Sequence, residues 1–88
     1  SYDNKCLLIT AIRGYFSQLE SDGVLEYGQS TVDIDMDAQK TYLQSIGKDP
    51  SSMTEQEIRS ANTGDKVFLS ASIKILDAIE DIDLKIMI

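Results

Sequence analysis

Three aspartates at alternate positions, Asp33, Asp35 and Asp37, have the residue type and spacing of a metal site. Alternate carboxylates of this kind surround Ca²⁺ in the first half of an EF-hand loop. The rest of that loop is missing, because Ala38 stands where the sharp turn needs glycine and Gln44 stands where a bidentate glutamate is needed. The pattern favours two solvent-facing aspartates on a strand and a third that caps a helix. A calcium-binding module stays an alternative, which calcium-dependent melting would reveal.

A second acidic group, Glu80, Asp81 and Asp83, has the residue type for general acid–base chemistry. No nucleophile, oxyanion donor set or phosphate-binding glycine loop accompanies it, so a solvated turn is the better interpretation. The pair Gly47-Lys48 is not a Walker loop, since it follows no predicted strand and neither serine nor threonine comes after the lysine. We therefore predict no catalytic, cofactor-binding or metal-binding residues, and a protein that is not an enzyme.

The composition removes further classes of function. Histidine, the commonest general base and metal ligand, is absent. The one cysteine, Cys6, lies among apolar residues and is predicted to be a small buried side chain rather than a reactive thiol. A net charge of −7 repels a phosphate backbone, so nucleic acid is not an expected partner. The acidity is shared evenly, because residues 1–44 hold seven acidic and three basic groups and residues 45–88 hold eight and five.

The hydrophobic pattern predicts a soluble, unexported α+β protein with a single domain over residues 1–88. No apolar run reaches the roughly 20 residues needed to cross a bilayer, and no signal sequence opens the chain, so no membrane partner is expected. Apolar residues recur at helical spacing in some segments and alternate in others. The predicted elements are helices at residues 4–19, 37–46 and 54–61, packed against a small, mainly antiparallel sheet with strands near residues 31–36, 66–76 and 82–88.

The predicted helices begin and end at recognisable capping residues. Asp3 and Asp37 are placed to accept hydrogen bonds from the first free N–H groups of the first two helices. Gly23 and Gly47 offer the left-handed conformation that closes them. Residues 54–57, Thr-Glu-Gln-Glu, form a capping box at the start of the third helix.

The end of the chain is the least ordinary feature. Residues 82–88 place four large apolar side chains on one face of a strand that finishes on isoleucine. A small sheet has few ways to cover such a strand, so we expect its edge to pair with a strand of another chain. The alternative is that the helices cover it within one chain. The predicted subunit-interface residues are apolar side chains of the last two strands: Val67, Phe68, Leu69, Ile73, Ile75, Ile82, Leu84, Ile86 and Ile88.

Two strings, Asn-Thr-Gly-Asp-Lys-Val-Phe-Leu at residues 62–69 and Ile-Leu-Asp-Ala-Ile-Glu-Asp-Ile-Asp-Leu at residues 75–84, resemble the C-terminal domain of contractile tail sheath proteins. Such proteins occur in bacteriophages, prophages and phage-tail-like bacteriocins. Further similar strings lie at residues 12–16, 19, 23–25, 32–35, 38–39 and 42–43. The resemblance covers nearly the whole chain and rests on apolar patterns and short strings rather than on a catalytic signature.

The resemblance implies a structural function. Sheath subunits of that family stack as rings around a tail tube, with their C-terminal domains as the inner layer, and arms of neighbouring subunits add strands to each sheet. Relaxation of the metastable lattice drives the tube through the target envelope without nucleotide hydrolysis. The implied partners are other sheath copies, in a homo-oligomer, and the tail tube protein. The implied location is the virion tail, assembled in the bacterial cytoplasm. Complete members are several hundred residues long.

The acidic surface permits a different class of function, a small adaptor or inhibitor that docks on a basic protein partner. Salt distinguishes the two hypotheses. Binding through an acidic surface weakens steeply as ionic strength rises, whereas strand exchange over apolar faces does not.

Overall fold

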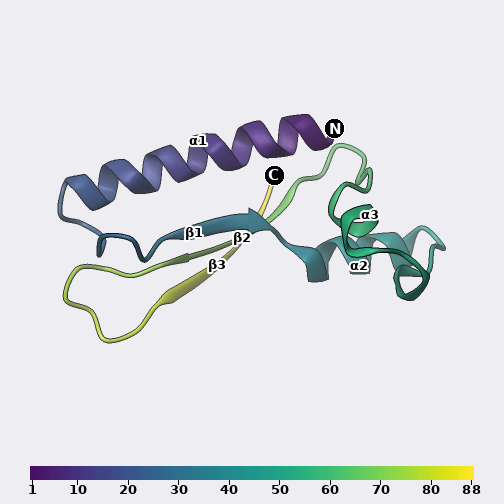
Figure 1. Cartoon of the computed structure of the whole chain (residues 1–88). Helices are drawn as coiled ribbons and strands as arrows, with labels where there is room; N and C mark the ends of the chain where they lie inside the picture. The colour runs from purple at the N-terminus through teal and green to yellow at the C-terminus, as the bar shows by residue number, and fades with distance from the viewer.

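One long helix lies along a three-stranded antiparallel sheet, and the shorter helices lie beyond one end of the sheet (Figure 1). The computed structural model describes residues 1–88 and confirms the predicted α+β class. No helix is long and apolar enough to cross a membrane. In chain order the elements are α1 (Tyr2–Ser21), β1 (Thr31–Ile34), α2 (Met36–Ser45), the 3-10 turn η1 (Pro50–Ser52), α3 (Glu55–Arg59), β2 (Phe68–Ile73) and β3 (Ile82–Met87).

Helix α1 begins earlier than predicted. Ser1, not Asp3, is the N-cap, because its side-chain oxygen accepts a hydrogen bond from the backbone N–H of Asn4. Asp3 lies in the first turn, where its negative charge interacts favourably with the positive end of the helix dipole. At the other end Gly23, with φ of +75°, closes the helix as predicted. The amphipathic pattern therefore located the helix correctly and misplaced its first turn.

The second helix also begins early, by one residue, and its N-cap lies two residues before the predicted one. The strand predicted over residues 31–36 ends at Ile34, and Asp35 rather than Asp37 is the N-cap of α2. The Asp35 Oδ1 atom accepts a 3.0 Å hydrogen bond from the backbone N–H of Ala38. The apolar alternation continues through Met36, but this side-chain hydrogen bond starts a helix there instead of prolonging the strand. The capping box of α3 is confirmed, with both of its reciprocal hydrogen bonds present.

The sheet order is β1-β2-β3, so β2 is the central strand and β3 pairs antiparallel with it as predicted. The strand predicted over residues 66–76 is shorter, because residues 74–76 leave the sheet and bond to the loop after α1. There the backbone N–H of Glu26 donates to the Lys74 carbonyl over 2.8 Å, and Leu25 forms an isolated bridge with Ile75.

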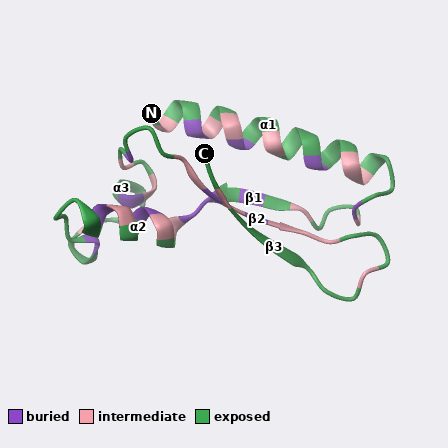
Figure 2. Ribbon diagram, turned by 180° about the vertical axis from the view of Figure 1, so that it is seen from behind, coloured by how far each residue is buried: buried purple, intermediate pink, exposed green.

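The core lies between α1 and the adjacent face of β1 and β2. Buried side chains of α1, among them Ile9 and Phe16, belong to one cluster with Val32, Leu69 and Ala71 of the two strands. Helix α1 contacts β1 along its length and leaves β3 the most exposed element of the sheet (Figure 2). The alternating apolar side chains therefore form a buried face on β1 and β2, whereas those of β3 remain largely exposed.

A buried polar cluster joins α1 to the shorter helices. Gln39 of α2 is fully buried, and its Nε2 group donates to the carbonyl of Ile58, at the end of α3, over 3.0 Å. The Lys5 ammonium reaches the same place from α1 and donates to the Ala61 carbonyl over 3.0 Å and to Gln39 Oε1 over 3.5 Å. Burial lowers the pKa of Lys5, since leaving water disfavours its charged form.

Candidate interaction surface

The free edge of β3 is the feature that best fits the predicted pairing with another chain. Val67 and Ile88 exchange both of their backbone hydrogen bonds, at 2.9 and 3.0 Å, which fixes the alternation along the two strands. The N–H and C=O groups of Ile82, Leu84 and Ile86 therefore point to β2. Those of Asp83, Lys85 and Met87 point away from it, towards the open side of the sheet. Six backbone groups are thus presented to an incoming strand.

The side chains beside this edge are apolar and only partly covered. Cross-strand register places Ile82, Leu84 and Ile86 on the same face as the buried residues of β2. Helix α1 does not reach this far, so Leu84 remains 36% exposed, whereas its cross-strand neighbour Ala71 is 3% exposed. Ile88, at the end of the strand, is 58% exposed. An added strand with apolar residues at alternate positions would continue the buried face.

The opposite edge of the sheet, at β1, is partly blocked by side chains, which bond two of the four outward backbone groups of Val32 and Ile34. Arg13 of α1 donates from Nη2 to the Val32 carbonyl over 3.2 Å. Asp33 Oδ1 accepts the backbone N–H of Ile34 over 2.8 Å. These are outward-facing backbone groups of β1, because Asp33 and Thr31 direct theirs to β2. The two edges therefore differ, and β3 is the one suited to strand addition.

The nine predicted interface residues do not form one surface. Leu69 is fully buried in the core, and Val67, Ile73 and Ile86 are half-buried against it. Phe68 lies on the other face, with its ring centroid 6.1 Å from that of Tyr42. The residues with exposed side chains are Ile75, Ile82, Leu84 and Ile88. Sequence reasoning did not name Asp83, Lys85 and Met87, although the alternation of the strand already implied that their backbone groups face outward.

The three aspartates of the proposed calcium site do not converge: Asp33 and Asp35 bond to different partners, and Asp37 lies unpaired in the first turn of α2. Asp33 forms a two-pronged ion pair with Arg59 of α3, with 3.1 Å between Oδ2 and Nη1. Asp35 caps α2 and lies 3.4 Å from the Lys85 ammonium. No group of three or more acidic or cysteine side chains is arranged to hold a metal ion. Cys6, predicted to be buried, is only partly covered.

The Asp33–Arg59 ion pair makes stability depend on pH. Hydrogen bonds from Arg59 are the main cause that lowers the pKa of Asp33. A carboxyl group whose pKa is lowered by folding stabilises the folded state at pH values above its pKa in the unfolded chain, which is about 3.9. This stabilisation is lost as the pH falls through the pKa of the group in the folded state. Because the Asp33 side chain is about half exposed, we expect Asp33→Asn to lower the free energy of unfolding at pH 7 by no more than about 1 kcal/mol.

Urea titrations measure this difference. The gap between the original chain and Asp33→Asn should shrink as the pH falls below about 4. The variant Asp37→Asn, in which the altered aspartate is not paired, serves as the control and should show a smaller gap. A gap for Asp33→Asn that stays constant with pH would contradict the role of the ion pair.

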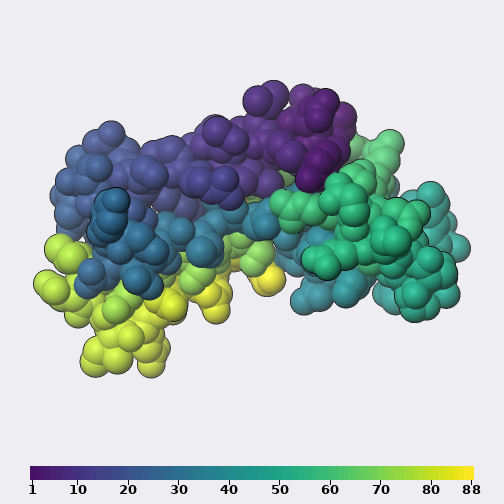
Figure 3. Space-filling model, viewed as in Figure 1, coloured from purple at the N-terminus to yellow at the C-terminus, as the bar shows by residue number.

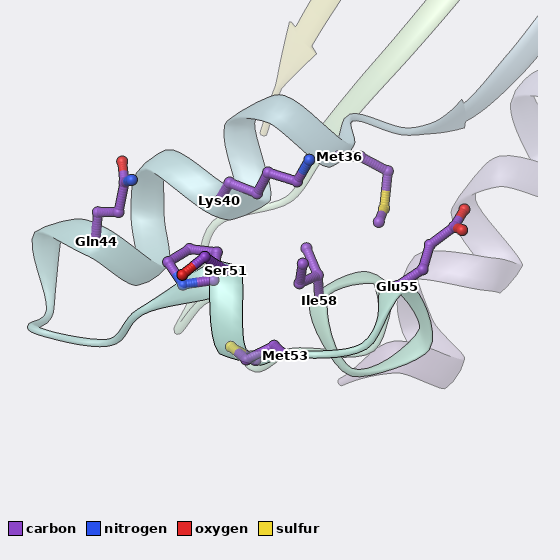
Figure 4. Close-up of a pocket in the computed structure, with 8 residues that line it drawn as sticks. Met36, Lys40, Gln44, Ser51, Met53, Glu55 and Ile58 are labelled. Carbon is purple, nitrogen blue, oxygen red and sulfur yellow. The ribbon is translucent and has the colours of Figure 1, made fainter.

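A shallow hollow lies between α2, η1 and α3 (Figure 4). Its volume is about 550 Å³. The Lys40 and Glu55 side chains lie on different elements around it, and Met36, Met53 and Ile58 supply its apolar lining. The lining offers neither a nucleophile paired with a base nor a set of metal ligands, so nothing in it suggests a reaction.

Comparison with known proteins supplies the family. No family model matches the chain. A tail sheath protein of Clostridium phage phiCD119 is 40% identical to it over 86 residues, which include 98% of this chain and 24% of that protein. The chain thus spans about a quarter of the length of its curated relative. The family resemblance seen at residues 62–69 and 75–84 is confirmed. This chain is a homologue of a phage tail sheath protein and is a tail sheath domain.

Proposed function

We propose that this chain is a structural domain of a contractile tail sheath, which polymerises with other sheath copies around the tail tube in the virion tail. Its role is to hold subunits together by strand exchange, so that contraction of the lattice drives the tube through the target envelope. The role involves no catalysis and no cofactor. The free edge of β3 is the observation that carries the mechanism, and the sheath relative supports the family.

In this mechanism an extended segment of a sister subunit pairs with β3. It would bond to the outward backbone groups of Asp83, Lys85 and Met87, each hydrogen bond contributing about 0.5–1.5 kcal/mol net. Its alternate side chains would cover Leu84 and Ile82, which keep part of their surface in water. Full burial of such a side chain contributes about 1.5–3 kcal/mol relative to exposure, and these two would gain the remaining part. These gains oppose the cost of ordering the arm, which is about 1–2 kcal/mol for each residue whose backbone is fixed.

Proline at residue 85 tests the mechanism in a complete sheath protein that carries this domain. Lys85→Pro removes one outward N–H while keeping the hydrogen bonds to β2, since Lys85 does not bond to that strand. The matched control, Lys85→Ala, removes the side chain and its contact with Asp35 but keeps the N–H. Both proteins should fold, as judged by circular dichroism.

Electron microscopy of the assembled particles gives the result. We expect contractile tails with Lys85→Ala and none, or a reduction of about tenfold or more, with Lys85→Pro. Equal numbers of sheathed tails in the two preparations would show that strand addition at β3 does not hold the lattice together.

A further inference from the structure

Two segments far apart in sequence meet at the end of the molecule opposite the shorter helices. Residues 20–28 comprise the end of α1 and the loop after it, and residues 74–83 comprise the connection from β2 to β3 and the first two residues of β3 (Figure 1). The Leu76 N–H donates to the Val24 carbonyl over 3.0 Å, and the Asp77 N–H donates to Glu26 Oε1 over 3.2 Å. Figure 3 shows the two segments side by side, dark blue and yellow-green, at the left end of the molecule. We call this end the hairpin tip.

The hairpin tip gathers exposed apolar side chains. Six of the twelve large exposed apolar residues of the chain belong to it: Val24, Tyr27, Ile75, Leu76, Ile79 and Ile82. Ile79 is 96% exposed and Tyr27 is 87% exposed, so their side chains contribute little to the fold. Clusters of this kind, in contrast to scattered apolar residues, mark surfaces that contact other proteins.

Nearly all the net charge of the chain lies at the same end. The hairpin tip holds seven of the fifteen acidic residues, at positions 20, 22, 26, 77, 80, 81 and 83, and one of the eight basic residues, Lys74. Its net charge is therefore −6 out of −7 for the whole chain. The charge is shared evenly between residues 1–44 and 45–88 because each half of the sequence contains one of the two acidic segments. The fold then brings the two segments together at one end.

The acidic groups of the hairpin tip have no cationic partners. Both ion pairs in the structure, those of Asp33 and Asp35, lie elsewhere. Glu20 instead accepts the backbone N–H of Gly28 over 3.1 Å, and this hydrogen bond is the main cause that lowers its pKa. Five of the seven acidic residues of the hairpin tip, at positions 22, 77, 80, 81 and 83, are exposed to water.

We propose that the hairpin tip is a docking surface for a different protein, one that presents lysine or arginine side chains around an apolar hollow, with Ile79 as the apolar anchor. Charge complementarity selects this partner. A second copy of the domain does not supply it, since Lys5 is buried, Arg13 and Arg59 are engaged within the chain, and its remaining basic residues are interspersed with acidic ones. The hairpin tip shares only Ile82 and Asp83 with the edge used in strand addition, and its proposed docking role stands whether or not that mechanism holds.

A model peptide tests this surface on the 88-residue chain. The probe is an amphipathic lysine–leucine peptide, and the readout is the shift of backbone amide signals by NMR. Signals of residues 20–28 and 74–83 should move, and the Kd should rise about tenfold or more between about 20 mM and about 300 mM salt. A companion peptide in which serine replaces leucine should bind at least about fivefold more weakly, because the apolar anchor then has no partner.

Variants assign the effect to the hairpin tip. The pair Glu80→Gln and Asp81→Asn, and separately Ile79→Ser, should each raise the Kd for the lysine–leucine peptide about fivefold or more. The control pair Asp37→Asn and Asp65→Asn makes the same change in charge at the other end and should alter it less than about twofold. Equal weakening by the two pairs, an unchanged Kd for Ile79→Ser, or equal binding of the serine peptide would overturn the proposal.

Discussion

Replacing Gln39 by leucine is expected to lower the free energy of unfolding by about 2–4 kcal/mol. The side chain is fully buried and donates to the Ile58 carbonyl, while its oxygen accepts from the Lys5 ammonium. Leucine has a similar size but neither polar group. The Ile58 carbonyl would then lose its donor from Gln39. The buried Lys5 ammonium would have the Ala61 carbonyl as its one remaining acceptor. Unmet hydrogen-bonding groups in a buried site are costly, and the cost increases when one of them is charged.

Thermal unfolding followed by circular dichroism measures the effect. A loss of this size corresponds to a fall in Tm of roughly 10–20 °C for a domain of this length. Gln44→Leu, on an exposed position of the same helix, is the matched control and should change stability by less than about 0.5 kcal/mol. Adding Lys5→Met to Gln39→Leu should restore part of the loss, because it removes the stranded charge. If Gln39→Leu melts within about 2 °C of the original chain, the polar cluster does not stabilise the fold.

Leu69→Ala is expected to cost about 2.5–5 kcal/mol, the usual range for a leucine deleted from a packed core. Leu69 is fully buried at the centre of the sheet, opposite Ile34 on one neighbouring strand and Ile86 on the other. An 88-residue domain has a total stability of only about 5–13 kcal/mol, so this variant should lose a large share of its stability and unfold at a clearly lower urea concentration.

Leu84→Ala is the matched comparison, since it makes the same truncation on the same face one strand away. Leu84 keeps about a third of its surface in water, so the loss should be below about 2 kcal/mol. Urea midpoints for the two variants decide between these values. Equal losses would mean that α1 covers β3 as fully as it covers β2. The comparison also separates folding from assembly, because Leu84→Ala should keep most of the stability of the fold while weakening the edge of β3.

Local patterns were sufficient to predict the type and order of most elements. Strands β2 and β3 have strong alternation, and their pairing needs only a connection between neighbours in sequence. The capping box and Gly23 are similarly local signals. The boundaries at Ser1 and Asp35 were missed because several residues near a helix start can cap it, and the choice depends on which side chain reaches a free N–H.

The surface was harder to predict than the fold. Alternation shows that Leu69 and Leu84 lie on one face of a sheet, but it does not show how far α1 extends across that face. Both were predicted interface residues, and only the second has an accessible side chain. The charge of the hairpin tip was missed for a related reason, since it depends on a contact between residues about 50 positions apart.

The side chains that partly block the edge of β1 limit the assemblies that an isolated copy can form. Joining two domains through their β3 strands would give a continuous sheet whose outer strands are both β1, and Arg13 and Asp33 obstruct each of those. The assembly would stop at a dimer, whereas an amyloid fibre requires every added chain to present another unpaired strand edge. A domain with one open edge strand and one partly blocked edge can therefore pair with another strand without extending into a fibre.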